Sequence, residues 1–464
     1  MKLLYNVQDK PKFGKLVIFA LQQLLAIMTA TLVVPVIIGN GMQPAAALFG
    51  AGIGTIVYLL FTKFRSPVFL GSSFAFLGSM GAAFTGGVSM AVGYLGLIIG
   101  AVLAGLVYVL ISIIVKIAGV KWISKLMPAT VIGPTVAIIG LSLAGNAVGD
   151  LMSGGLKVDS VSVCSPLIAV LVGVITLIVT MVCSVYGKKS GKLIPFIYGI
   201  LAGYAFAAIL TLIGNAANID AIKVINFSAL TAPFADGISF ASFIAAPTFT
   251  FVTALGGFTE ITGTYIATIA VAYIPVAFVV FAEHIADHKN LSSIIGKDLL
   301  EDPGLSRTLL GDGVGSAVGA IFGGCPNTTY GESIGCVAIT KNASVYTILC
   351  AAAGAILISF ITPFVAFVNS IPSCVMGGVC MALYGFIAVS GLKMIKDVDL
   401  NENKNLFVVS AILIAGVGGL TLTFGKITLT SIAAALILGI IINLILSKGK
   451  NTEIPEDDNA PDNK

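Results

Sequence analysis

Long apolar stretches, separated by short polar runs, dominate this sequence. A helix needs about 20 predominantly apolar residues to cross a bilayer, and the pattern predicts roughly fourteen such segments. In order, they are 15–39, 44–62, 67–84, 90–116, 122–147, 161–186, 193–214, 264–288, 308–324, 326–341, 345–369, 372–392, 405–424 and 428–447. The third and the tenth are too short and too polar to cross as simple helices. The pattern therefore predicts an all-α polytopic membrane protein in which these two segments are interrupted by short extended stretches.

The most polar of these segments lies within the stretch 325–341, which reads CPNTTYGESIGCVAITK. It lies between apolar segments yet contains a proline, an asparagine, two glycines and the ionisable Glu332. Polar backbone of this kind is found at membrane depth only where it is buried in protein or lines a cavity. We therefore expect the functional site here.

Composition agrees with the membrane class. The 464 residues are 57% hydrophobic and only 10% charged, whereas a soluble domain is about 25% charged. The net charge of +4 is small and the lysines lie in short loops, which argues against a nucleic-acid partner. The seven cysteines all fall in apolar segments without a CxxC pair, so we interpret them as small core residues rather than ligands or disulfides.

The distribution of basic residues predicts the orientation. Lysines and arginines are concentrated in alternate loops, and the intervening loops hold only Lys157, Lys223 and Lys426. By the positive-inside rule both termini lie in the cytoplasm, and we expect a multi-pass protein of the plasma (inner) membrane. The stretch 215–263 is placed outside as a long loop with short interfacial pieces, with an extra hidden span as the alternative. The acidic tail 448–464 is expected to be disordered.

The two interrupted segments resemble each other. Ser72-Ser73-Phe74-Ala75 and Thr328-Thr329-Tyr330-Gly331 both read hydroxyl, hydroxyl, aromatic, small. Each lies in the third segment of a block of seven, and an odd number of spans makes the two blocks opposite in orientation. Paired, interrupted segments at matching positions point to a transporter's substrate site. The alternative is a coincidence in a glycine-rich chain.

Acidic residues inside spans are candidates for function, because a charge at a helix centre costs about 2.5–3.5 kcal/mol. We place three there, namely Glu283, Asp287 and Glu332. Glu283 and Asp287 lie one helical turn apart, and two such carboxyl groups cannot both ionise cheaply. One is therefore expected to hold a proton near neutral pH, as a proton-coupled carrier requires. The alternative is an ordinary cytoplasmic helix end beside Lys289.

The other polar and aromatic residues favour a binding site for a flat heterocyclic ligand over a metal site or an enzyme active site. His284 and His288 are the two histidines, but His284 points about 100° away from Glu283, so we expect neither a metal site nor an enzyme. Ser72-Ser73 and Thr328-Thr329 are predicted helix caps, and the free N–H groups of a half-helix suit carbonyl oxygens. Flat apolar faces are offered by Phe74, Tyr330 and Tyr384. A nucleobase fits that inventory.

Several stretches of the sequence resemble those of a known transporter family. The stretch NTTYGESIGCVAIT is similar to the tenth-segment signature of uracil permeases in the nucleobase–ascorbate transporter family. Further similar stretches are LGSSFAF (70–76), AEH (282–284), KDLLEDPGLSR (297–307) and IPSCVMGGVCMALYG (371–385). Together they extend over nearly the whole chain, from about residue 15 to 445.

The resemblance implies fourteen helices in two inverted repeats of seven, divided between a core and a gate domain. The implied divisions are 1–14 (cytoplasmic N-terminus), 15–116 (core), 117–214 (gate), 215–263 (extracellular loop), 264–369 (core), 370–447 (gate) and 448–464 (tail). It also implies proton-coupled uracil symport by alternating access, with H⁺ as the coupling ion and no cofactor, in a lipid membrane and often as a homodimer.

By motif match, Glu283 and Glu332 would bind the pyrimidine edge, and Glu283 with Asp287 would couple the proton. The pocket would be completed by Ser73, Phe74, Tyr330 and Gly331, by Ala30 from the first segment and by Tyr384 from the gate.

This chain departs from the family pattern at three places. Asp287 stands where uracil permeases carry a histidine, and purine-transporting relatives carry an aspartate at this position. Gln22-Gln23 replaces a Gln-His pair, and the stretch 215–263 is longer than expected. Xanthine or another purine therefore remains an alternative substrate. An anion carrier of the same architecture, an ion channel and a membrane enzyme are the other function classes left open.

Overall fold

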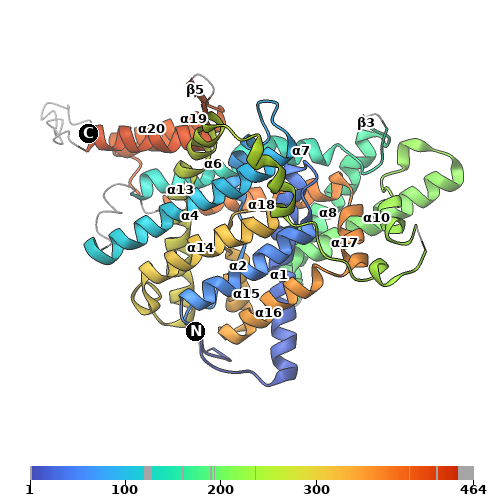
Figure 1. Cartoon of the computed structure of the whole chain (residues 1–464), viewed down its shortest axis with the longest axis horizontal. Helices are drawn as coiled ribbons and strands as arrows, with labels where there is room; N and C mark the ends of the chain where they lie inside the picture. The colour runs from blue at the N-terminus through green and yellow to red at the C-terminus, as the bar shows by residue number, and fades with distance from the viewer. Residues whose placement is uncertain are drawn as a thin grey trace, which may run out of the picture.

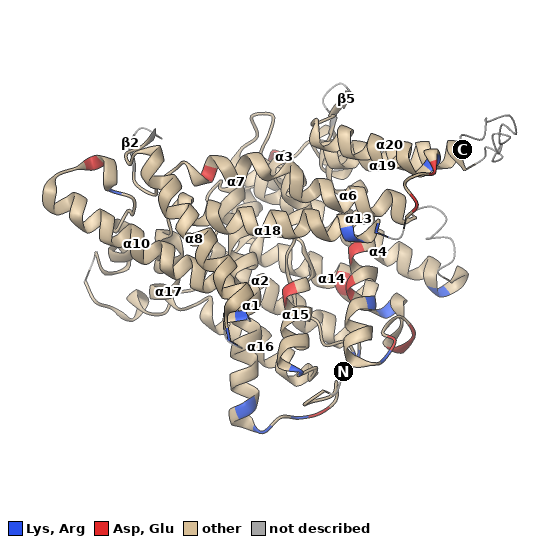
Figure 2. Ribbon diagram, turned by 180° about the vertical axis from the view of Figure 1, so that it is seen from behind, with Lys and Arg blue, Asp and Glu red and all other residues tan. Residues whose placement is uncertain are grey.

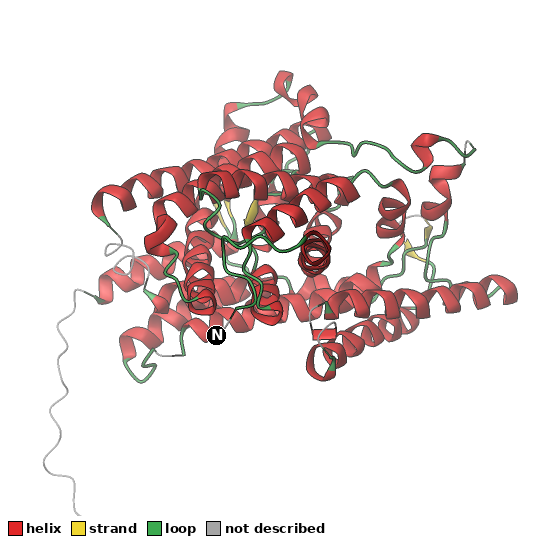
Figure 3. Ribbon diagram, turned by 90° about the horizontal axis from the view of Figure 1, so that it is seen from below, coloured by secondary structure: helices red, strands yellow, loops and turns green. Residues whose placement is uncertain are grey.

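The computed structural model describes residues 3–119, 128–158, 161–188, 191–192, 194–235, 237–396, 398–424 and 427–447. These ranges are overwhelmingly helical, with a few short strands between the helices (Figures 1 and 3). The predicted tail 448–464 and several lysines used for the orientation, among them Lys121, Lys125, Lys189 and Lys426, lie outside the described residues.

Eight helical stretches in the described ranges are long and apolar enough to cross a membrane. They are α1 (Phe13–Ile38), α2 (Pro44–Phe61), α4 (Met90–Ala118), α6 with α7 (Ala129–Ser142 and Ala144–Leu151), α8 (Pro166–Tyr186), α10 (Pro195–Ala217), α13 (Gly263–Ile295) and α18 (Ser373–Met394). Charged residues are sparse along them (Figure 2). The chain is therefore a predominantly helical, multi-pass membrane protein, as the apolar pattern predicted.

The remaining helices are shorter. They comprise α14 (Leu305–Gly323), α16 (Val345–Ile358), α17 (Thr362–Ser370), α19 (Asn403–Val417) and α20 (Ser431–Leu446). The single segment expected over 345–369 is wrong, because it is divided between α16 and α17. The division has a local cause: Pro363 occupies the first turn of α17, where its missing N–H and fixed φ favour a helix start.

The stretch 215–263 contains short helical pieces only. After α10 they are η2 (Asp220–Ile222), α11 (Ser228–Thr231), η3 (Ala232–Phe234), η4 (Phe240–Ser242), α12 (Thr250–Ala254) and η5 (Leu255–Thr259). The longest apolar helical run among its described residues is Thr250–Thr259, which is too short to cross a bilayer. The alternative of an extra span hidden here is therefore wrong.

Glycines set the closest helix contacts. A Cβ added to Gly315 of α14 would lie 2.7 Å from the carbonyl oxygen of Gly54 in α2, and the reverse substitution meets the same distance. A second close approach joins Gly391 of α18 to Gly133 of α6. Small residues allow this backbone contact between membrane helices. Helix α14 thus packs on α2 and α4, while α18 packs on α6, α7 and α8.

Two short strands meet inside the bundle. Strand β1 (Leu70–Ser72) pairs antiparallel with β4 (Asn327–Thr329), with Gly71 opposite Thr328. Both strands are fully buried. Strand β1 leads into η1 (Phe74–Phe76) and α3 (Leu77–Ala82), and β4 leads into α15 (Gly331–Thr340). Each of these two stretches, called here the first and the second broken segment, is thus a strand followed by a short helix.

Two further pairs of strands lie between helices, and the sequence did not predict them. They are β2 (Lys157–Val158) with β3 (Val161–Ser162) and β5 (Leu422–Phe424) with β6 (Ile427–Leu429). The helices α19 and α20 are correspondingly shorter than the apolar segments 405–424 and 428–447.

Candidate functional site

A cavity of about 410 Å³ lies where the broken segments meet α13. Residues of α1, η1, α13, β4 and α15 line it, together with residues of α6, α8, α10 and α18. The volume lies within the range of about 300–1,000 Å³ that is typical of small-molecule sites. The cavity is therefore lined by elements from distant parts of the chain.

Three carboxyl groups face this cavity. Glu283 and Asp287 line it from successive turns of α13, and Glu332 lines it from the first turn of α15. No ion pair among the described residues involves any of the three. Lys192 is the one basic residue among those that line the cavity, and it lies at the exposed start of the α10 region. The arrangement suits a ligand that donates hydrogen bonds.

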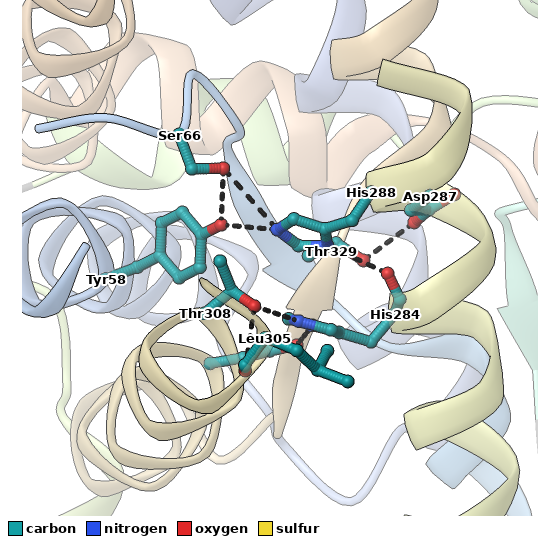
Figure 4. Close-up of polar contacts among 9 residues, drawn as sticks. Tyr58, Ser66, His284, Asp287, His288, Leu305, Thr308 and Thr329 are labelled. Carbon is teal, nitrogen blue, oxygen red and sulfur yellow. Dashed lines mark hydrogen bonds and ion pairs between the residues drawn. The ribbon is translucent and has the colours of Figure 1, made fainter. Parts of the chain in front are cut away.

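The second broken segment is tied to α13 and to the first. Thr329 donates from Oγ1 to Oδ2 of Asp287 over 2.7 Å (Figure 4). The Tyr330 hydroxyl donates to the Ser72 carbonyl over 2.7 Å. The first bond holds the carboxyl group of Asp287 at the end of β4, and the second holds the ring of Tyr330 against the end of β1.

The start of α15 differs from the sequence expectation. We predicted Thr328-Thr329 as its cap, but its N-cap residue is Tyr330 and no side chain caps it. The prediction of Ser72-Ser73 is also wrong, because Ser73 precedes η1 without a capping hydrogen bond. The Thr329 hydroxyl is engaged by Asp287 instead. The first N–H groups of α15 are therefore free of a side-chain cap, which suits them to an acceptor on a ligand.

Space next to this helix end is open. A Cβ added at Gly331 would meet no atom within 4 Å, and Gly331 lines the cavity. A ligand can therefore approach the backbone at this position closely.

Seven of the nine predicted site residues line the cavity and two do not. Those that line it are Ser73, Phe74, Glu283, Asp287, Tyr330, Gly331 and Glu332. Ala30 is buried in the packing of α1, and its neighbour Thr29 faces the cavity in its place, because adjacent helical positions point about 100° apart. Tyr384 is buried behind Phe74, with ring centroids 5.9 Å apart.

The two histidines are not among the residues that line the cavity, and their rings point from α13 toward Tyr58 and Thr308 (Figure 4). His284 contacts Oδ2 of Asp312 through Nδ1 at 2.7 Å and Oγ1 of Thr308 through Nε2 at 2.9 Å. His288 Nε2 lies 2.7 Å from the Tyr58 hydroxyl. Both rings are fully buried. They connect α13 to α14 and α2 and do not face the cavity, in agreement with the angle expected between His284 and Glu283.

Asp312 corrects the count of acids inside the spans. We placed three there, but Asp312 lies in the interior of α14 and is fully buried. The sequence carried a signal for it, since GDGVGS falls within the apolar segment 308–324. The criterion that identified Glu332 applies to Asp312 equally.

Three further residues were missed. Gln23 of α1 contacts both the hydroxyl and the carbonyl oxygen of Ser333, next to Glu332, and Phe69 N donates to the same hydroxyl over 3.1 Å. Thr29 lines the main cavity and also a second, apolar cavity of about 70 Å³ between α1, α10, α17 and α18. Ile197 of α10 likewise lines both cavities. For Gln23 the sequence carried a signal, because Gln22-Gln23 stands where the family carries a Gln-His pair, whereas the positions of Thr29 and Ile197 depend on helix packing alone.

The chain is similar to known permeases over nearly its whole length. The profile of a permease family matches residues 14–425. The uracil permease of Bacillus caldolyticus is 38% identical over 96% of this chain and 95% of its own length. The uracil permease of Bacillus subtilis (strain 168) is 38% identical over 97% of both chains. That of Escherichia coli (strain K12) is 36% identical over 95% of this chain and 93% of its own length.

Two solved structures share the fold at low sequence identity. The transmembrane domain of a cyanobacterium bicarbonate transporter superposes with a TM-score of 0.59 at 12% identity, covering 96% of this chain and 100% of that one. The murine solute carrier 26 family member A9 anion transporter, in its inward-facing state, gives a TM-score of 0.62 at 11% identity, covering 95% of this chain and 69% of that one.

Proposed function

This chain belongs to the permease family, and on that premise we propose that it is a proton-coupled symporter that imports uracil across the plasma membrane. Family membership makes it a transporter rather than an enzyme. Support for uracil comes from the relatives, which carry the name uracil permease at 36–38% identity over nearly the full length of each chain.

The observation that carries the proposal is the shared cavity of Glu283, Asp287 and Glu332 beside the uncapped start of α15. Carboxylates accept hydrogen bonds, so Glu283 and Glu332 suit the N–H groups of a pyrimidine. The free N–H groups of α15 suit its carbonyl oxygens. Phe74 and Tyr330 supply aromatic faces on the same wall. One planar ligand with alternating donors and acceptors satisfies all of these groups together.

The transport cycle that we propose is alternating access between a core and a gate domain. The core would comprise 15–116 and 264–369, and the gate 117–214 and 370–447, as fourteen segments in two inverted repeats of seven. The pairing of β1 with β4, one from each half of the chain, supports the repeat. The cavity wall includes Ser184, Lys192 and Met394 near helix ends that the charge pattern places in the cytoplasm, so we propose an inward-facing state.

In that state the second cavity, which shares Thr29 and Ile197 with the first, would be the closed outer part of the pathway. Both termini would lie in the cytoplasm. Assembly as a homodimer within the lipid bilayer is proposed on the resemblance alone.

We further propose that H⁺ is the coupling ion and that Glu283 and Asp287 carry it, with no other cofactor. The test is uptake of labelled uracil into proteoliposomes with and without an inward proton gradient. A gradient should drive accumulation, and purely equilibrative uptake would refute the coupling. We expect Asp287→Asn to flatten the dependence of uptake on pH while uracil still binds. A variant with an unchanged pH profile would remove Asp287 from the proton route.

A purine such as xanthine is the second candidate, favoured by the acidic Asp287 at this position of α13. Competition decides between the two: unlabelled uracil and xanthine are compared as inhibitors of labelled uracil uptake by the purified protein. Stronger inhibition by xanthine than by uracil itself would reverse the assignment.

A further inference from the structure

Residues 3–10, called here the N-terminal strap, pair through their backbone with the end of α15 and the connector that follows it, and then turn, with Asp9 N donating to the Asn6 carbonyl over 3.1 Å. Leu4 N donates to the carbonyl oxygen of Lys341 over 2.7 Å. In return, the carbonyl oxygens of Tyr5 and Val7 each accept a backbone bond of 3.0 Å, from Ala343 N and Val345 N respectively. The strap therefore adds a parallel strand-like edge to the connector that follows α15.

The side chains of the strap differ in burial. Val7 is only 5% exposed and packs in the same apolar cluster as Tyr330 and Ile334, whereas Leu4 is 56% exposed. The strap is thus anchored through one face as well as through its backbone.

Side-chain contacts also join the strap to two other parts of the chain. The Ser344 hydroxyl donates to the Asp9 carbonyl over 2.7 Å, and the Lys10 ammonium lies 4.9 Å from the centre of the Tyr346 ring. On the other side, the Gln8 amide donates to the carbonyl oxygen of Phe64, in the turn between α2 and β1. The strap therefore links two parts of the chain: residues 341–345, which follow the second broken segment, and Phe64, which precedes the first broken segment.

The helix that the strap holds is short. Helix α15 has ten residues, Gly331–Thr340, and carries Glu332 in its first turn. Isolated helices of this length are marginal, and the carbonyl groups of a last turn lack partners within the helix. Its ten residues span only about 15 Å, so contacts that hold the far end of α15 also restrict the position of its first turn, which carries Glu332.

From these contacts we infer that the N-terminal strap is a positioning element for Glu332: it holds the far end of α15 and so sets the geometry of the carboxyl group in the cavity. The strap itself does not line the cavity. The inference rests on the proposed function for its transport consequence, but its structural part stands on the described contacts alone.

The experiment uses the purified full-length protein with Val7→Asn, and Leu4→Asn as the matched control at an outward-facing position. Without ligand, we expect amide hydrogen exchange over 331–345 to become at least about tenfold faster in Val7→Asn and to stay unchanged in Leu4→Asn. Exchange in α4 and α18 should stay at the wild-type rate in both. Uracil is then the probe for binding. We expect Val7→Asn to raise the Kd for uracil about tenfold, and the conservative variant Val7→Ile to bind uracil with the wild-type Kd.

Wild-type exchange over 331–345 together with a Kd within twofold would overturn the inference. Uniformly faster exchange across the protein would also overturn it, because the strap would then stabilise the whole fold and position nothing in particular. If Val7→Asn does not fold, Ser344→Ala removes the bond to Asp9 in its place, and the same readouts decide. Failure of the wild-type protein to bind uracil would defeat the proposed function, whereas the exchange measurement would still decide on the strap.

Discussion

The first and second broken segments lie antiparallel and meet over three pairs of residues, from Leu70 opposite Thr329 to Ser72 opposite Asn327. The backbone bonds continue beyond the strands, with Ser73 N donating to the Pro326 carbonyl over 2.9 Å. Their chemistry is different. The first carries no ionisable group over 70–82, whereas the second carries Glu332.

One aligned position makes the difference concrete. When Ser72–Ala75 is matched to Thr328–Gly331, the next residues are Phe76 and Glu332. Phe76 is buried and stacks on Tyr273, with ring centroids 5.5 Å apart and an angle of 25° between the planes. Glu332 faces the cavity. The first broken segment is thus anchored by apolar packing, whereas the second presents a carboxyl group and a helix start without a side-chain cap to the cavity.

The largest expected effect comes from exchanging the chemistry at this pair of positions. Glu332→Gln removes a charged acceptor, and hydrogen bonds to charged groups contribute about 1.5–3 kcal/mol. We therefore expect uracil to bind roughly tenfold to hundredfold more weakly, with little change in thermal stability. The measurement is equilibrium binding of labelled uracil to purified protein.

Phe76→Ala is the counterpart in the first broken segment. Truncating a buried Phe costs about 3–5 kcal/mol of folding free energy, so we expect a lower melting temperature rather than a selective loss of binding. Unchanged uracil affinity in Glu332→Gln would take Glu332 out of the pocket, and unchanged melting in Phe76→Ala would contradict the division of roles.

A second test concerns the contact between the two segments. A Cβ on Gly71 would run into the Tyr330 ring and lie 2.9 Å from Oγ1 of Thr31. Overpacking of this kind costs about 1–3 kcal/mol, so Gly71→Ala should lower thermal stability and displace the ring whose hydroxyl bonds to Ser72. Thermal unfolding and uracil uptake are measured together. Wild-type values for both would show that the two segments do not depend on this contact.

Much of this arrangement followed from composition and spacing. The apolar pattern predicted the helical membrane class. The polar stretch 325–341, its counterpart at Ser72–Ala75 and the i, i+4 pair Glu283 and Asp287 together contain the seven predicted residues that line one cavity. The membrane class was predictable because the cost of burying polar groups in a bilayer is large and local. A residue that is out of place in an apolar segment can be recognised without knowing its neighbours.

The misses were of a different kind. The facing residue of α1 is Thr29 instead of Ala30, a difference of one position that depends on the rotation of a helix within the bundle. Thr329 bonds to Asp287 instead of capping α15, and two competing partners cannot be ranked from the sequence. Asp312 was overlooked although its own segment was recognised. The strap on α15 was invisible because backbone pairing between residues 3–10 and 341–345 leaves no motif.

The open space at Gly331 supports a sharper, smaller test. Because an added Cβ would meet no protein atom within 4 Å, Gly331→Ala should leave stability unchanged. If the substrate lies against this backbone, as we propose, the methyl group will obstruct it, and we expect roughly fivefold weaker binding. Wild-type affinity would place the ligand away from the start of α15, and the melting temperature serves as the control against a folding defect.

The smallest expected effect concerns the bond from Thr329 to Asp287. Thr329→Val keeps the shape of the side chain and removes the 2.7 Å donor. A neutral hydrogen bond contributes about 0.5–1.5 kcal/mol, so uracil affinity should change by no more than a few fold. Asp287 loses a hydrogen-bond donor in this variant, and we therefore expect the pH dependence of uptake to differ from that of the wild type. Thr328→Val is the matched control, since Thr328 lines the same cavity without a bond to Asp287. Equal pH profiles for the two variants would mean that the strand end does not govern protonation in α13, and the second broken segment would then act through Glu332 and its backbone alone.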